Sequence, residues 1–326
     1  MQGKEPSERN AKVKSNVGID VSKSWLDVCV LPSGAARRVS NTPQGIRQLK
    51  RWLGRFELAL VLMEATGKWH RAVHRSLFSS AIPVAVVDPY RVRMFAKAQG
   101  ILAKTDRLDA RVLAQFAAVM APAVRAPAPQ VMQDLAELVR ARDSAVAEET
   151  ALKNQLSAAT VRFLKRQLER RIVRIAKDIA ALDQQIQRQI EDDETLARRY
   201  AILTSIIGFG PVIASTLIAC LAELGHCSRR QIGMLAGLAP RADESGERKG
   251  VRIVFGGRPA VRRCLYLAAF VAARHNPQMK AFFRHLCAAG KPTKLALIAV
   301  ARKLVVLANT LIAENRAYNP QPPKYA

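Results

Sequence analysis

The sequence predicts an α/β domain followed by a longer all-α region, and three patterns in its 326 residues support this. Short apolar runs alternate with amphipathic segments up to about residue 120. Apolar residues then recur at heptad spacing between 164 and 190, and the last third is helical and punctuated by glycine. Because 49% of the residues are apolar, the chain can bury sizeable cores, and its length suits two domains.

Three strands open the α/β domain. Residues 17–21 are typical of a short buried strand, and the alternating apolar residues of 26–30 predict an antiparallel neighbour. A turn at 32–34 contains proline and glycine, and it leads to a third strand at 37–40.

Helices and parallel strands follow. Thr42 is a helix cap before Pro43, and this helix is predicted to end near Leu53. The apolar run 58–63 is typical of a central strand, with Glu64 at its carboxyl end. The remaining predicted elements are a helix at 68–79, a strand at 83–87, and helices at 89–98 and 105–120. This order of elements is that of ribonuclease-H-like folds.

A proline-containing linker separates the α/β domain from a heptad pattern. Its prolines are Pro122, Pro127 and Pro129. The heptad positions beyond it are Leu164, Leu168, Ile172, Ile175, Ile179, Leu182, Ile186 and Ile190. A narrow apolar stripe with charged flanks predicts long helices in a coiled coil over 131–195 and favours pairing between chains. The alternative is a helix that lies on its own globular domain.

The last third begins with a segment that resembles a helix-hairpin-helix, at residues 205–218. There Gly208 and Gly210 would let the backbone turn sharply, and the N–H groups that open the second helix would hold a phosphate. The basic residues Arg229, Arg230, Arg262 and Arg263 favour contact with DNA. An ordinary turn between two helices is the alternative.

The charge of the chain predicts an anionic partner. There are 52 Lys and Arg against 26 Asp and Glu, a net charge of +26, which most often indicates nucleic acid. Membrane residence is not expected, because Arg302 and Lys303 break the most apolar stretch, 295–312. The N-terminus lacks the apolar core of a signal peptide, so we expect a cytoplasmic protein.

Cysteines and histidines do not predict a metal site. The five cysteines form no Cys-x-x-Cys pair, and reduced thiols are expected. His226 beside Cys227 does not fit the spacing of a structural zinc site. His70 and His74 share one helix face, where we expect surface or half-buried residues.

Four carboxylates within the first 110 residues are the strongest indication of chemistry: Asp20, Glu64, Asp106 and Asp109. Each interrupts or ends an apolar segment, where a charge is costly unless it is paired. Asp106 and Asp109 can project from one helix face, toward the acids on the two strands. Such a cluster would hold Mg²⁺ or Mn²⁺ for phosphodiester chemistry. Alternatively, Asp106 and Asp109 cap a helix and Asp20 belongs to a turn.

Ser245 is a second candidate catalytic residue. It precedes Gly246 in a polar loop that also contains Arg241, Arg248 and Arg252, whose guanidinium groups would stabilise an attacked phosphate. By itself, Ser-Gly in a loop usually marks only a turn.

These residues also carry a family resemblance. The chain resembles DEDD transposases of the insertion-sequence one-ten group, with its eleven-eleven subgroup, which are bridge-RNA-guided recombinases. The matching segments are Gly18-Ile-Asp20, Met63-Glu-Ala-Thr-Gly67, Lys104-Thr-Asp-Arg-Leu-Asp-Ala110, Ile207-Gly-Phe-Gly210, Leu235-Ala-Gly-Leu-Ala-Pro240, Ser245-Gly246 and Gly257-Arg-Pro-Ala-Val-Arg-Arg263. The resemblance covers nearly the whole chain, leaving out the basic N-terminal arm and the proline-rich tail.

The resemblance implies a RuvC-like domain, a coiled coil and a transposase domain. It implies that Asp20, Glu64, Asp106 and Asp109 are the metal ligands and that Ser245 links transiently to DNA. A structured bridge RNA would pair with donor and target DNA, and dimers would assemble into a tetramer with composite sites. The expected organisation is a basic arm at 1–14, a RuvC-like domain at 15–125, a coiled coil at 130–195, a helical transposase domain at 196–316 and a tail at 317–326.

Two other functions remain open from the residues. A RuvC-like nuclease that hydrolyses branched DNA would need the four acids and have no use for Ser245. A non-catalytic nucleic-acid-binding protein would need neither. The low aromatic content, 6%, argues against a protein that binds single strands by base stacking.

Overall fold

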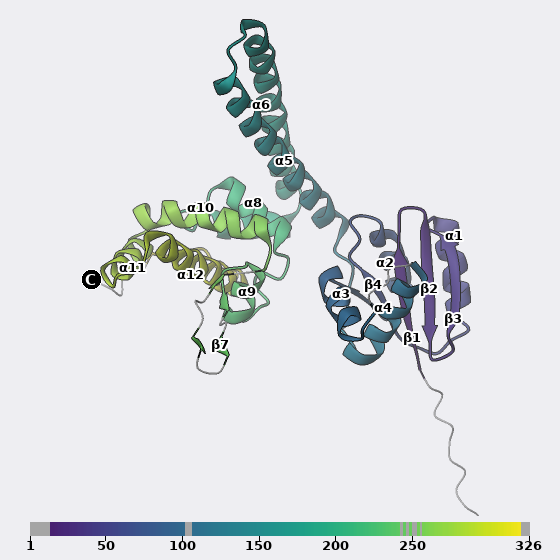
Figure 1. Cartoon of the computed structure of the whole chain (residues 1–326). Helices are drawn as coiled ribbons and strands as arrows, with labels where there is room; N and C mark the ends of the chain where they lie inside the picture. The colour runs from purple at the N-terminus through teal and green to yellow at the C-terminus, as the bar shows by residue number, and fades with distance from the viewer. Residues whose placement is uncertain are drawn as a thin grey trace, which may run out of the picture. The chain divides into compact units, whose positions relative to one another are not determined.

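The computed structural model describes residues 14–101, 106–241, 244–245, 248–249, 253–254 and 256–320. The chain divides into two compact units, one up to Ala128 and one from Pro129, which Figure 1 colours purple to blue and teal to yellow. The predicted arm at 1–14 and tail at 317–326 lie largely outside the described residues.

The first unit is built on a mixed five-stranded sheet. Its strands are β1 (Ser15–Val21), β2 (Trp25–Leu31), β3 (Ala35–Ser40), β4 (Leu58–Glu64) and β5 (Val84–Val87). Their order is β3-β2-β1-β4-β5; the first three pair antiparallel, whereas β4 is parallel to both β1 and β5. This mixed α/β arrangement confirms the predicted fold class at the level of the sheet.

Helices cover both faces of this sheet. They are α1 (Pro43–Leu53), α2 (His70–Phe78), α3 (Pro89–Ala98) and α4 (Asp106–Met120). One hydrophobic core joins α1 and α2 to a face that includes Val17, Ile19 and Met63. The other core joins α3 and α4 to the opposite face, which includes Leu60 and Leu62. Because side chains alternate along a strand, the neighbours Met63 and Glu64 belong to opposite faces.

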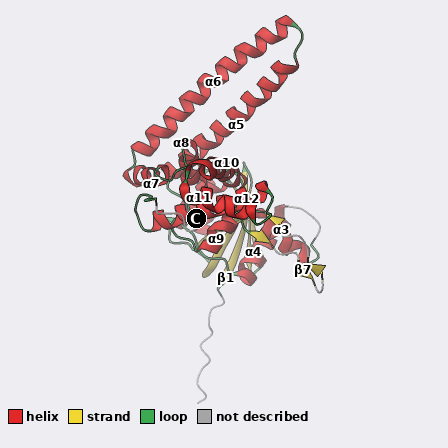
Figure 2. Ribbon diagram, turned by 90° about the vertical axis from the view of Figure 1, so that its left-hand side faces the viewer, coloured by secondary structure: helices red, strands yellow, loops and turns green. Residues whose placement is uncertain are grey.

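Two long helices open the second unit. Helix α5 (Gln130–Ala158) and helix α6 (Arg162–Glu191) pack against each other as an antiparallel hairpin, which Figure 2 shows along its length. Within one chain the predicted stripe is only partly covered. Leu168, Ile186 and Ile190 are buried, but Leu164 near the tip is 47% exposed. Pairing between chains therefore stays a prediction.

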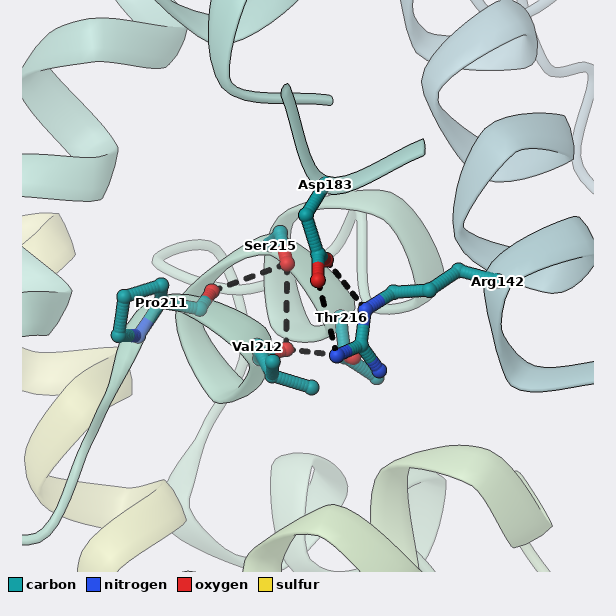
Figure 3. A network of polar contacts seen from close by, with 6 residues as sticks. All are labelled: Arg142, Asp183, Pro211, Val212, Ser215 and Thr216. Carbon is teal, nitrogen blue, oxygen red and sulfur yellow. Dashed lines mark hydrogen bonds and ion pairs between the residues drawn. The ribbon is translucent and has the colours of Figure 1, made fainter. Parts of the chain in front are cut away.

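An ion pair joins the two helices of the hairpin, and hydroxyl groups of the neighbouring helix α8 (Pro211–Cys220) are satisfied within that helix. The guanidinium of Arg142 on α5 donates to the carboxylate of Asp183 on α6 (Figure 3). In the buried helix α8, the Ser215 hydroxyl donates to the Pro211 carbonyl at 2.9 Å, and the Thr216 hydroxyl donates to the Val212 carbonyl at 2.7 Å. These bonds satisfy hydroxyl groups that would otherwise be buried at a cost.

The rest of the second unit is a helical domain with small strand pairs. Its other helices are α7 (Glu194–Thr204), α9 (Arg229–Leu235), α10 (Pro259–His275), α11 (Pro277–Ala288) and α12 (Thr293–Ala313). Its strands are β6 (Pro240–Arg241), β7 (Glu244–Ser245), β8 (Arg248–Lys249) and β9 (Ile253–Val254). The strands pair as β6 with β9 and β7 with β8.

Helix α12 is long and apolar enough to cross a membrane by length and composition, but half of that segment is buried inside the protein. Leu297, Leu304 and Leu311 are among its residues in the main core of this unit. This burial is typical of the core helix of a globular protein.

Candidate functional site

Asp20 and Glu64 lie side by side on two parallel strands. The register of β1 and β4 pairs Ile19 with Met63, so the next residue on each strand is an acid. Aligned residues of neighbouring strands project to the same face. The two carboxylates, both half-buried, thus project from one face at the carboxyl ends of their strands.

Helix α4 packs on that face at Gly18. A Cβ atom added to Gly18 would lie 2.0 Å from the carbonyl oxygen of Ala110 and 2.4 Å from the amide nitrogen of Ala114. Only glycine therefore allows the helix backbone to rest on β1. Since Asp109 precedes Ala110, this contact places the first turns of α4 beside the face that carries Asp20.

The four predicted ligands thus lie on three elements that pack together. Asp109 is half-buried, while Asp106 is the first residue of α4 and its side chain lies outside the described part. Carboxylate oxygens suit a hard divalent cation, so the donor chemistry fits Mg²⁺ or Mn²⁺. Among the side chains that the structure describes, no three His, Cys, Asp or Glu groups are already gathered as a metal site.

Asp27 is a further acid on this face, and it lies between apolar residues of the strand predicted over 26–30. It pairs across the sheet with Asp20 on one side and Arg38 on the other. Its side chain is buried and accepts two hydrogen bonds from Arg38, 2.7 Å from Nε and 2.8 Å from Nη2. Glu64, Asp20, Asp27 and Arg38 therefore form one row over four adjacent strands.

The bidentate pair explains how Asp27 is tolerated there. Two carboxylates directly opposite each other repel. A guanidinium that meets one of them in the bidentate geometry offsets its charge and fixes its orientation. A buried acid between apolar strand residues was the signal for this position.

Ser245 lies at the end of β7, where its partner in the antiparallel pair is Arg248 of β8. Ser245 and Arg248 are therefore backbone neighbours that flank residues 246–247. Arg241 belongs to β6 and pairs with Ile253. The side chains of Ser245, Arg241 and Arg248 lie outside the described part, as does the whole of Arg252. Figure 1 shows β7 on a strand pair that extends from the helices of its unit.

Gly208 has a packing role. Its φ is +108°, and a Cβ atom there would lie 2.8 Å from the Cβ of Ala272 and 3.1 Å from the carbonyl oxygen of Ala268. The turn between α7 and α8 is thus pressed against α10. Gly210 is the N-cap of α8 and has open space around it. The role of this turn in holding a phosphate stays a prediction.

The predicted arginines at the start of α10 also make contacts within the protein. Arg262 donates to the carbonyl of Gly256 at 2.7 Å, whereas Arg263 is largely exposed and pairs with Asp143 of α5 at 2.9 Å. Nearby Arg258 forms a bidentate pair with Glu223 at 2.6 and 2.7 Å. Of Arg262 and Arg263, both predicted to contact DNA, Arg263 is the more accessible.

Of the two histidines that share a helix face, His74 is more buried than expected. The ring is buried, and its Nε2 lies 2.9 Å from the carbonyl oxygen of Arg125, so Nε2 is the donor. Burial lowers the pKa of His74, which favours the neutral ring. The expected surface or half-buried position is wrong for His74 because this contact ties the chain after α4 to helix α2.

Two family models match the chain. The model of the DEDD domain of IS110 elements, described as "Transposase", matches residues 17–164. The model described as "Transposase IS116/IS110/IS902 family" matches residues 200–284. The first match contains the four acids, and the second contains Ser245.

Similar proteins include recombination and transposition proteins. The chain is 27% identical over 317 residues to the pilin gene-inverting protein of Moraxella bovis, covering 94% of this chain and 98% of that protein. It is 24% identical to the transposase for insertion sequence element IS1111A of Coxiella burnetii, covering 74% and 72%. It is also 27% identical to a 42 kDa protein of insertion element IS900 from Mycobacterium paratuberculosis, covering 55% and 44%.

Proposed function

Because the chain belongs to the IS110/IS116/IS902 family of transposases, we propose that it cuts and rejoins DNA with two separate sets of residues. The chain is a DNA transposase or recombinase by its family and relatives. In our proposal Asp20, Glu64, Asp106 and Asp109 hold Mg²⁺ or Mn²⁺. Ser245 is the nucleophile.

The single observation that carries the metal proposal is the packing of α4 on Gly18. It brings the helix with Asp106 and Asp109 onto the sheet face where the register of β1 and β4 places Asp20 beside Glu64. Three elements that pack together therefore carry the four acids, and carboxylate oxygens are the ligands that a hard divalent cation prefers. Divalent ions bound there would polarise a DNA phosphate and stabilise the charge of the leaving oxygen.

The serine proposal concerns a covalent intermediate. The Ser245 hydroxyl oxygen attacks a DNA phosphate and forms an O–P bond, while the bond from phosphorus to one deoxyribose oxygen breaks. The hydroxyl proton passes to solvent, and the leaving oxygen takes up a proton. A phosphodiester is kept at every stage, so rejoining needs no external energy source. Arg248, the backbone neighbour of Ser245, supports the proposal because a guanidinium can neutralise charge on the attacked phosphate.

The covalent adduct gives a direct test. Protein, guide RNA and labelled donor and target DNA are incubated with Mg²⁺, and a protein–DNA adduct that survives denaturation is sought. Ser245→Ala should lose the adduct and strand exchange together, yet still bind RNA and DNA. If Ser245→Ala cuts DNA at the wild-type rate, a hydrolytic nuclease of the RuvC type takes the place of this mechanism.

Asp106→Asn tests the metal half of the proposal. This variant should lose strand exchange and bind Mg²⁺ more weakly, with its fold and its affinity for nucleic acid kept. Full activity of Asp106→Asn would refute the assignment of the four acids.

The partners follow from the charge and the family. We propose donor and target DNA, a structured bridge RNA, and an oligomer that assembles from dimers to a tetramer in the bacterial cytoplasm, near the nucleoid. The net charge of +26 suits a surface that binds more than one polyanion. A non-catalytic nucleic-acid-binding protein is disfavoured by the relatives, which include a transposase and a gene-inverting protein.

Inversion of a DNA segment is a second candidate outcome of the same chemistry. It is favoured by the relative named for pilin gene inversion, which aligns over nearly the full length of both proteins. A plasmid that carries paired sites in inverted orientation distinguishes inversion from movement of an element to a new site.

A further inference from the structure

The row of acids on the sheet continues into an exposed aromatic residue. Trp25 lies two residues before Asp27 on β2, so both belong to the same face of the sheet. The guanidinium carbon of Arg38 lies 6.0 Å from the ring centroid of Trp25. Trp25 is 47% exposed and the side chain of Arg38 is 48% exposed, although Asp27 between them is buried. The face that carries Asp20 thus extends into an accessible tryptophan and arginine.

The side chain of Arg38 and the backbone of Trp25 are held in place. The bidentate pair with Asp27 fixes Arg38. The backbone of Trp25 is fixed by Ser22, whose hydroxyl accepts from the Trp25 amide and donates to the Trp25 carbonyl, both at 3.0 Å. The side chain of Asn41 links this turn to the loop after β4, because it donates to the carbonyl of Ser22 at 2.9 Å and to the carbonyl of Trp69 at 3.2 Å. A ligand would meet a rigid surface and pay little to order it.

More positive charge surrounds the same end of the sheet. The ammonium groups of Lys23 and Lys68 lie 5.9 and 5.1 Å from the ring centroid of Trp69. Lys23 follows the strand of Asp20, and Lys68 follows the strand of Glu64. Single exposed aromatic residues are common. Trp69 itself packs against the core on the opposite face of the sheet. Trp25 and Arg38, however, lie on the face of the acids, and two lysines follow the strands that carry Asp20 and Glu64, which suits a surface that binds a nucleic-acid strand.

We propose that Trp25 and Arg38 form the binding surface for an unpaired stretch of the DNA strand that carries the scissile phosphate. Trp25 stacks on one base, and the exposed part of Arg38 contacts a neighbouring backbone phosphate. Asp27 is a positioning residue that aims Arg38. This inference rests on the proposed function, since it takes the acids as the place where the phosphate reacts. DNA is the occupant because strand cleavage requires the DNA backbone to reach those acids.

Photocrosslinking tests the contact at Trp25. Full-length protein is bound, without divalent metal, to a single-stranded DNA oligonucleotide with 5-iododeoxyuridine at successive positions, and the crosslinked peptide is identified by mass spectrometry. The crosslink should map to Trp25 and disappear in Trp25→Ala. Affinity for this DNA, measured at a salt concentration that weakens general electrostatic binding, should fall about tenfold in Trp25→Ala and much less in Trp25→Phe.

Matched variants separate this site from general effects. Tyr90→Ala removes another exposed aromatic residue of the same unit and should change neither crosslink nor affinity. Arg38→Gln should weaken DNA binding and reduce the salt dependence of the affinity by about one phosphate contact. Arg51→Gln is the control, because Arg51 lies on helix α1, which covers the other face of the sheet, and it should change neither quantity. If Trp25→Phe lowers the affinity for this DNA as much as Trp25→Ala does, stacking on Trp25 is contradicted.

Other outcomes also decide the matter. A loss of affinity confined to an RNA oligonucleotide of the same sequence, or equal losses for fully paired DNA, would overturn the inference. The crosslink needs neither the acids nor Ser245 to react. An active Asp106→Asn variant would therefore refute the metal site alone, while an adduct at Ser245 without the Trp25 crosslink would refute this inference alone.

Discussion

At the scale of single residues, Gly18 decides whether the acids can meet. The face of β1 that bears Asp20 would be too far from α4 if any side chain separated them, because a Cβ at Gly18 would overlap the backbone of Ala110 and Ala114. The main chain cannot move aside as a flexible side chain would. The catalytic role that we propose for Asp20 therefore depends on a neighbour with no chemistry of its own.

Gly18→Ala should lower the free energy of unfolding by about 1–3 kcal/mol, the usual cost of overpacking, and should lower strand exchange more than stability alone explains. The added methyl group displaces the first turns of α4, which carry Asp106 and Asp109. Thermal unfolding and DNA exchange are measured on the same preparation. Gly54→Ala is the control, because its nearest neighbours lie 3.6 Å from the new Cβ and its φ of −61° suits alanine. Equal effects of the two substitutions would refute the role of Gly18.

The sequence predicts which acids lie on strands and helices, but not the contacts between strands. Asp20 and Glu64 can be found because each interrupts or ends an apolar run. Asp27 also lies between apolar strand residues, but its place opposite Asp20 and Arg38 follows only from the register, and no local pattern reveals a register. The buried position of His74 is not predictable for a similar reason, since its partner, the carbonyl of Arg125, is 51 residues away along the chain.

At the scale of elements, the stripe on α6 explains the hairpin and is the basis of the pairing between chains that we predict. Leu168, Ile186 and Ile190 are buried within one chain, whereas Ile172 and Ile179 in the middle are only half-buried. Near the tip Phe163 is 72% exposed. A stripe covered on one side by α5 leaves apolar area for a second chain to bury.

The element boundaries themselves were predicted closely in the first unit, because caps and prolines mark them locally. Thr42 and Pro43 were expected to open a helix, and the Thr42 hydroxyl accepts from the amide of Gly45, at 3.2 Å. Pairing of α6 with α5 could not be read in the same way, since a heptad stripe has the same form whether its partner is in the same chain or another.

Replacing Ile172 and Ile179 with Asp should therefore weaken association of the chains by at least about tenfold, since an unpaired charge in an apolar seam costs more than the 1.4 kcal/mol of a tenfold change. Light scattering without RNA measures the oligomer, and circular dichroism checks that the hairpin stays helical. Ala176→Asp with Ala180→Asp adds the same charge at exposed positions of α6 and should leave the oligomer unchanged. An unchanged oligomer in the Ile172 and Ile179 variant would count against the stripe as the contact.

At the scale of the whole molecule, the proposed catalytic residues lie in different units, whereas the positive charge is a property of the whole chain. The acids belong to the first unit and Ser245 to the second, so neither unit alone should form the adduct. The positive charge favours binding of DNA and of RNA, because a net charge of +26 attracts any polyanion regardless of its sequence. Sequence preference must then come from something other than charge, and base pairing with a guide RNA would supply it.

Binding should accordingly depend steeply on salt and little on sequence until the RNA is present. With protein alone, affinities for a target duplex and for an unrelated duplex should be similar. If the chain neutralises six to ten phosphates, each affinity should fall by about 10³–10⁵ between 50 and 200 mM salt. Fluorescence anisotropy over a series of salt concentrations measures this slope, and the same series with bridge RNA should show the target preferred at every salt concentration. A flat slope would mean that the basic surface is not the contact. A target preference without RNA would mean that the protein itself reads the bases, for which side chains in a groove, rather than a guide strand, would be responsible.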